Sequence, residues 1–191
     1  LGFLGVPHAP ELKLVVTNGV GAGYVPTLLQ QTQPLHAQVG LASALYELDA
    51  NGASGLSPLH PAVRLLQGLF DAVDPLNHAQ RLTTEETSRH LLHIYTSADP
   101  FAPEATQESL VRILDVPLVG PAPFAFEVKT LTAPVQGNRD NGATTALFFA
   151  APGEGVEAHR ALLYGAAPIA KLATFIASWI VDGIPTFPGD D

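Results

Sequence analysis

The chain has 191 residues, of which 47% are hydrophobic and 14% charged, and its 18 acidic and 9 basic residues give a net charge of −9. This charge disfavours nucleic acid and anionic membrane surfaces as partners, because their phosphates would be repelled. Cysteine is absent, which excludes disulfides, thiolate metal ligands and a cysteine nucleophile. The length fits one domain over residues 1–191, and no apolar run approaches the roughly 18 residues of a membrane-spanning helix, so we expect no transmembrane segment.

The first part of the chain predicts one buried strand followed by helices. Residues 11–19 (ELKLVVTNG) have an apolar centre and end in turn-forming residues, which indicates a short strand. A helix or irregular crossing is expected over 23–31, and apolar spacing predicts a helix over 36–48. After a loop over 49–58, a helix is expected over 59–73. Its predicted inward residues are Val63, Leu65, Leu66, Leu69 and Phe70.

The second part predicts two further strands, each followed by a helix. A strand over 91–95 leads to a helix over 103–114, and an extended insertion rich in proline and β-formers is expected at about 116–143. A strand at 144–153 precedes a closing helix over 168–181, whose predicted inner stripe is Ile169, Leu172, Ala173, Ile176 and Ile180. Strands of low polarity that alternate with helices favour an α/β fold, a mostly parallel sheet with helices on both faces.

Two loops that follow predicted strands carry the candidate catalytic residues. Asp99 lies just after the second strand, and His159 lies in a glycine-rich loop after the third. Ligand chemistry in parallel sheets collects at the carboxyl ends of the strands, and neighbouring strands are only about 5 Å apart. An aspartate bonded to one imidazole nitrogen fixes the tautomer and leaves the other nitrogen as a general base. We therefore expect Asp99 and His159 to form an acid–base pair.

The residues around this pair resemble a known family. SADPFAPEAT (97–106) is similar to the acid loop of esterases and lipases of the α/β-hydrolase superfamily, and GEGVEAHRALLYG (153–165) is similar to their histidine loop. LLQGLFDAVDPLNHA (65–79) resembles a segment of exported bacterial lipases, the group that includes virulence-factor lipases. The resemblance implies the C-terminal portion of that fold, with Asp99 and His159 as two members of a serine-hydrolase triad. It also implies export to the extracellular space or the cell envelope.

The third member of the triad has no candidate in the sequence. No G-x-S-x-G occurs, neither Ser43 nor Ser54 follows a predicted strand, and Ser97 lies beside Asp99. Methionine is absent, even at position 1, so we expect a piece of a longer protein whose N-terminal half, on the same or a separate chain, supplies the nucleophile. The alternative is a non-catalytic structural or binding domain that retains the hydrolase fold. A hydrolase or transferase of this fold with a non-ester substrate also stays open.

Other motifs indicate no metal and no cofactor. His90 and His93 form H-x-x-H, but residues three apart on a strand point to opposite faces, and no third ligand is near. NGVGAG (18–23) resembles a phosphate-binding loop, but Tyr24 stands where the dinucleotide fingerprint has glycine or alanine. We interpret this loop as one that lets the backbone pass close to the site.

The remaining polar and apolar candidates concern the walls of the site. Asp71 and Asp74 end the predicted 59–73 helix, where negative charges are unfavourable for the helix dipole. We expect this cost to be offset by Arg81 or by a structural role of these residues in a cap over the site. An apolar lining from Tyr24, Leu76, Phe101 and the 116–126 segment favours an acyl ester as substrate.

The other histidines are expected at surface or capping positions: His8, His36, His60 and His78.

Overall fold

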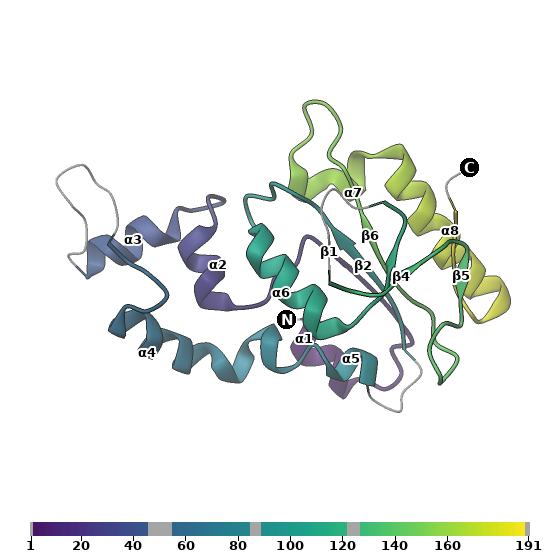
Figure 1. The fold of residues 1–191 in the computed structure, drawn as a ribbon, viewed down its shortest axis with the longest axis horizontal. Helices are drawn as coiled ribbons and strands as arrows, with labels where there is room; N and C mark the ends of the chain where they lie inside the picture. Colours follow the sequence, from purple (N-terminus) through teal and green to yellow (C-terminus); the bar gives the residue numbers. More distant parts are fainter. Residues whose placement is uncertain (1, 46–54, 85–88, 122–126, 190–191) are drawn as a thin grey trace.

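A computed structural model describes residues 2–45, 55–84, 89–121 and 127–189 (Figure 1). Its centre is a five-stranded sheet in the order β1-β2-β6-β3-β4, and every pairing in this sheet is parallel. The strands are β1 (Leu14–Asn18), β2 (His90–Tyr95), β6 (Thr145–Phe149), β3 (Leu118–Val119) and β4 (Thr130–Leu131). The predicted α/β class with a mostly parallel sheet is confirmed.

Strand β2 is the centre of the fold, and all six of its residues are buried. Leu91 and Tyr95 point to one face, where they pack with α6 (Glu104–Leu114) and the short helices α1 (Gly2–Gly5) and α5 (Arg81–Thr84). Leu92 and Ile94 point to the other face and pack with α7 (Ala161–Tyr164) and α8 (Ala166–Asp182). A strand without polar alternation therefore lies where both faces are covered, as its composition predicts.

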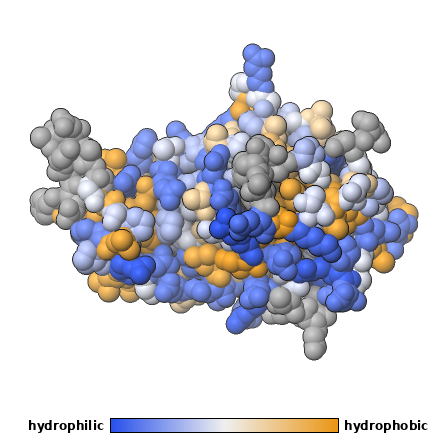
Figure 2. All heavy atoms as spheres, in the orientation of Figure 1, coloured by the Kyte–Doolittle hydropathy of each residue, from blue (hydrophilic) through white to orange (hydrophobic). Residues whose placement is uncertain are grey.

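Three helices form a group of their own beside α6. They are α2 (Tyr24–Gln30), α3 (Ala37–Ala44) and α4 (Pro61–Phe70), and they share a small core of Val25, Leu29, Ala42, Leu56 and Val63. Two 3₁₀ turns, η2 (Asp71–Val73) and η3 (Pro75–Asn77), lead from α4 back towards the sheet. This helical group lies at the left of Figure 1, and apolar side chains reach the surface over it in Figure 2.

Two predictions of inward helix faces are wrong. In α4, Leu65 and Leu69 are each 72% exposed, whereas Val63 is buried. In α8, Ile169 and Ile180 are 44% and 72% exposed and Ala173 is exposed as well, whereas Phe175 is buried. The apolar face of α4 is wider than the surface that meets the core, and α8 is apolar around most of its circumference, so the spacing of apolar residues does not determine which side is buried.

Helix α8 belongs to a segment whose length and apolar character can be compared with those of a membrane-spanning helix. No single described helix has both the length and the apolar character needed to span a bilayer. The segment Ala158–Tyr164 and α8 meet these two criteria only when taken together, and the pair bends by 63° at its junction.

The predicted insertion at about 116–143 contains three short strands. β3 and β4 are parallel and extend the main sheet beyond β6, while β5 (Val135–Gln136) pairs antiparallel with β7 (Thr186–Phe187). Residues 122–126 of the insertion lie outside the described part of the chain. The insertion thus separates the acid loop from β6 in sequence and leaves β2 and β6 adjacent in space.

Candidate active site

Asp99 and His159 meet at the carboxyl edge of the sheet. Asp99 follows β2, and His159 lies in η4 (Ala158–Arg160), which follows the neighbouring strand β6. Asp99 Oδ2 and His159 Nδ1 are 2.9 Å apart. The side chain of Asp99 is fully buried, whereas that of His159 is 37% exposed. The structure therefore brings together the two residues that the sequence places after neighbouring parallel strands.

The carboxylate of Asp99 is held in a fixed direction by its own loop. Oδ1 accepts hydrogen bonds from the backbone N–H groups of Phe101 (2.8 Å) and Ala102 (3.0 Å), which leaves Oδ2 for the histidine. Ala98 has a left-handed conformation (φ 55°), and its N–H donates to Glu104 Oε1. Strained residues of this kind persist where the surrounding structure requires them, and they cluster at functional sites.

His159 is fixed on one side and open on the other. Its carbonyl oxygen accepts from Asn18 Nδ2 at 3.1 Å, and its ring lies 4.6 Å from that of Phe101, centroid to centroid. A carboxylate can only accept hydrogen bonds. The hydrogen bond to Asp99 Oδ2 therefore requires the neutral His159 ring to carry its proton on Nδ1. No described residue is hydrogen-bonded to Nε2. Nε2 is therefore a proton acceptor at a partly exposed position.

The glycine-rich loop after β1 approaches this pair closely. Gly19 has a φ of +55°, and a Cβ at this position would lie 2.7 Å from Asp99 Oδ2 and 2.9 Å from His159 Nδ1. A Cβ on Gly21 would collide with the side chain of Thr106, whose carbonyl oxygen accepts from Ala22 N–H at 2.9 Å. Only glycine fits at these two contacts. The loop thus packs against the acid loop and α6, which agrees with its interpretation as a close backbone approach.

No nucleophile accompanies the pair within the described residues. Ser43 lies inside α3, and Ser97 lies in the turn that precedes Asp99. Ser54 lies outside the described part of the chain. Among the described serines, none is hydrogen-bonded to His159. The described site thus consists of an acid, a base and the loops that orient them.

Asp74 has a structural role that the sequence only hinted at. It is fully buried. Its Oδ1 accepts from the backbone N–H groups of Gly23 and Leu76, and its Oδ2 accepts from Tyr24 N–H and Gln67 Nε2. These bonds satisfy the N-terminal N–H groups of α2 and η3. Asp74 therefore connects the helical group to the glycine-rich loop.

The expected apolar lining is only partly at the pair. Phe101 lies against His159, as described above. The ring of Tyr24 instead packs against Phe70 at 5.6 Å between centroids, and Leu76 packs against the core on the α6 face of the sheet. The described part of the site thus has one aromatic wall, formed by Phe101.

His90 and His93 each have a separate structural environment. His93 is buried, its Nδ1 lies 2.7 Å from Thr17 Oγ1, and burial lowers its pKa to about 4. His90 Nδ1 accepts from Thr144 N–H at 3.0 Å, and burial also lowers its pKa. Over the described ranges, no three or more His, Asp, Glu or Cys side chains are grouped so that they could hold a metal ion.

Comparison with known proteins yields no relative. No protein-family model matches the chain, and neither a curated protein nor a solved structure matches it. The parallel sheet with helices on both faces is compatible with a hydrolase of the α/β type. The feature of the chain that bears most directly on function is therefore the geometry of the Asp99–His159 pair.

Proposed function

We propose that the chain is the C-terminal portion of a serine carboxylic-ester hydrolase, in which Asp99 and His159 are the acid and the base. The observation that carries this proposal is the 2.9 Å contact between His159 Nδ1 and the buried Asp99 Oδ2. A buried carboxylate that orients an imidazole, with Nε2 open to the outside, is the arrangement that activates a serine hydroxyl. The chain order, aspartate before histidine, also agrees with α/β hydrolases.

The proposed reaction uses His159 as base and then as acid. Nε2 removes the proton from a serine Oγ as this oxygen attacks the ester carbonyl. The imidazolium, stabilised by Asp99, returns the proton to the leaving alcohol as the carbon–oxygen bond breaks. Water then attacks the acyl-enzyme, with Nε2 again taking a proton and returning it to the serine. The products are an alcohol and a carboxylic acid.

The serine would come from outside the 191 residues, and β1 offers a place for its strand. Among the described strands, β1 pairs only with β2, and its five residues are half-buried. A parallel strand added beside β1, about 5 Å away, would end at the same edge as Asp99 and His159. A serine on the turn after that strand would then face Nε2. This supports an N-terminal half, on the same or a separate chain, that completes the sheet.

The experiment is ester hydrolysis by the full-length gene product. A panel of p-nitrophenyl esters with short and medium acyl chains would be assayed for the wild type, His159→Ala, Asp99→Asn and His8→Ala, in which an exposed histidine serves as control. We expect His159→Ala and Asp99→Asn to lower kcat by roughly 10³- to 10⁴-fold and His8→Ala to leave it unchanged. Hydrolysis that survives His159→Ala would contradict the proposed role of the pair.

The main alternative is a domain that retains the fold without catalysis. The lack of a described serine bonded to His159 is the observation that favours it. Two observations together would support this alternative. The full-length protein would cleave none of the esters, and the coding sequence before Leu1 would contain no G-x-S-x-G motif after a predicted strand. If that element is present and esters are not cleaved, a non-ester substrate becomes the better proposal.

A further inference from the structure

Gln107 of α6 is a fully buried amide that contacts the loop carrying Asp99. The hydrogen bonds of its side chain to described residues all go to the backbone of residues 96–102, here called the 96–102 loop. Oε1 accepts from Thr96 N–H at 3.3 Å, and Nε2 donates to the carbonyl oxygens of Thr96 (2.8 Å) and Ala102 (2.7 Å). Asp99 is the middle residue of this loop. One amide group thus joins the two ends of the loop.

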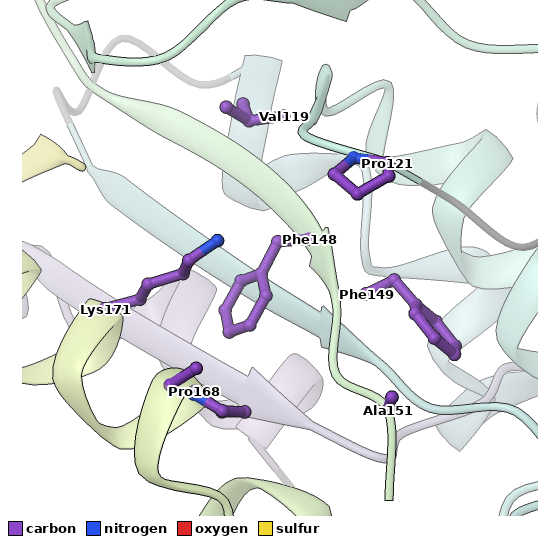
Figure 3. A pocket seen from close by; sticks show the side chains of 8 residues that line it. Val119, Pro121, Phe148, Phe149, Ala151, Pro168 and Lys171 are labelled. Atoms are coloured by element: carbon purple, nitrogen blue, oxygen red, sulfur yellow. The ribbon is translucent and has the colours of Figure 1, made fainter. Parts of the chain in front are cut away.

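The first end of the 96–102 loop is fixed by the sheet. The carbonyl oxygen of Tyr95 accepts from Ala150 N–H at 2.9 Å, and its ring packs against that of Phe149 at 6.1 Å between centroids. Figure 3 shows Phe149 at the end of β6, on the side of the strand away from α8. Thr96 follows Tyr95 directly, so its position is set by β2 and β6. A bond to Thr96 is therefore a bond to a point that the sheet holds in place.

The second end of the 96–102 loop bears directly on Asp99. Ala102 N–H donates to Asp99 Oδ1 at 3.0 Å, while the carbonyl oxygen of Ala102 accepts from Gln107. With Oδ1 held in this way, Oδ2 faces His159 Nδ1 at 2.9 Å. A displacement of Ala102 would turn the carboxylate and change its contact with the imidazole. Gln107 therefore acts on His159 through Ala102 and Asp99.

Other hydrogen bonds of the 96–102 loop are more open to water. Ala98 N–H donates to Glu104 Oε1 at an exposed position, and the carbonyl oxygen of Pro100 accepts from the N–H groups of the exposed residues 32 and 33. Water can replace partners of this kind. Gln107 is fully buried, so loss of its amide would leave backbone groups at both ends of the loop without a partner.

We infer that Gln107 is a positioning residue for the Asp99–His159 pair. Its amide closes the 96–102 loop and thereby holds the Asp99 carboxylate in line with His159 Nδ1. The effect on the geometry of the pair follows from the fold alone, whereas the effect on turnover rests on the proposed hydrolase function. A catalytic group misplaced by about 1 Å can cost about 100-fold in rate. Because the buried Gln107 touches no substrate, this loss should fall on kcat and leave KM unchanged.

The kinetic test is a double-mutant cycle in the full-length gene product, with p-nitrophenyl esters as substrates. Gln107→Met fills a similar volume but forms none of the amide's hydrogen bonds. We expect it to lower kcat about 10- to 100-fold and to change KM less than about twofold. In Asp99→Ala protein the same replacement should lower kcat less than about twofold, because the carboxylate through which Gln107 acts is gone. The matched control is Val111→Ala, at a buried residue one turn further along α6, which should leave kcat unchanged.

A second measurement requires no turnover. We expect the NMR resonance of the His159 Nδ1 proton in the full-length protein to shift or broaden in Gln107→Met and to stay unchanged in Val111→Ala. Gln107→Glu keeps the shape of the side chain but cannot donate to both carbonyl oxygens, so it should also disturb the resonance. Circular dichroism and thermal unfolding show whether each variant folds. Gln107→Glu keeps the test valid if Gln107→Met does not.

Three results would overturn the inference. They are an unchanged His159 resonance in folded Gln107 variants, a loss of kcat that is equally large in Asp99→Ala protein, and a loss of the same size in Val111→Ala. The last two would mean that Gln107 supports the fold in general and not the pair. If the full-length protein cleaves no ester, the proposed function fails, and the His159 resonance alone decides the role of Gln107.

Discussion

Replacement of Gly19 by alanine tests whether the glycine-rich loop holds the Asp99–His159 pair in place. The new methyl group would lie 2.7 Å from Asp99 Oδ2 and 2.9 Å from His159 Nδ1, closer than non-bonded atoms approach. Alanine at a φ of +55° costs about 1–2 kcal/mol by itself. Insertion of a methyl group into a packed site adds about 1–3 kcal/mol, because the carboxylate or the imidazole must move.

Gly137 provides the matched control for Gly19→Ala. It has the same φ of +55°, but the nearest atom to its added Cβ is Gly142 O, at an ordinary contact distance of 3.6 Å. Gly137→Ala therefore has the same backbone cost and the same effect on the unfolded chain, without the collision. The difference between the two variants isolates the contact with the pair.

Urea unfolding of the wild type and both variants is the assay. We expect Gly19→Ala to lower the free energy of unfolding by about 1–3 kcal/mol more than Gly137→Ala does. The NMR resonance of the His159 Nδ1 proton should also shift in Gly19→Ala alone. Equal losses of stability in the two variants, with an unchanged His159 resonance, would refute the argument that Gly19 fixes the geometry of the pair.

Three further predictions concern the polar side chains of His159, Asp74 and His93. Nitrogen NMR of the neutral His159 ring should show the proton on Nδ1, and Asp99→Asn should move the population towards Nε2–H; an Nε2–H ring in the wild type would contradict the assigned hydrogen bond. Asp74→Ala should lower the free energy of unfolding by about 2–4 kcal/mol in urea titrations, because buried N–H groups lose their acceptor, and a loss below about 1 kcal/mol would argue against the capping role. The pKa of His93 is lowered from 6.5 to about 4, so the unfolded state binds a proton in this window that the folded state does not. Stability should therefore fall by up to about 3 kcal/mol as the pH is lowered from 6.5 to 4, and the part of this slope due to His93 should disappear in His93→Gln; identical slopes in variant and wild type would count against it.

Much of the sheet and the acid–base pair follows from local sequence patterns. The strands around 91–95 and 144–153 are recognisable because they are short apolar runs bounded by turn residues. Polar residues just after parallel strands lie at one edge of the sheet, which is why Asp99 and His159 could be predicted to meet. They meet although they are 60 positions apart in the sequence, since the insertion extends the sheet on the far side of β6.

Other features depend on contacts that local patterns do not specify. The faces of α4 and α8 were predicted wrongly because the apolar surface of each helix is wider than the side that is buried, and only the position of the neighbouring elements decides which part of it meets the core. β3 and β4 are two-residue strands, too short for an alternation pattern. The contact between Gly19 and the pair can be recognised only in the three-dimensional structure. The sequence showed only that Asn18-Gly19, at the end of a strand, forms a turn.

The most direct test of the central claim is fluorophosphonate labelling of the full-length gene product, followed by mapping of the modified peptide. These reagents react with serines that an adjacent base has activated, so labelling reports the chemistry of His159 without a choice of substrate. The proposed function predicts one labelled serine outside residues 1–191, lost in His159→Ala and retained in His8→Ala. A labelled serine that His159→Ala does not affect, or no labelled serine in folded full-length protein, would contradict it.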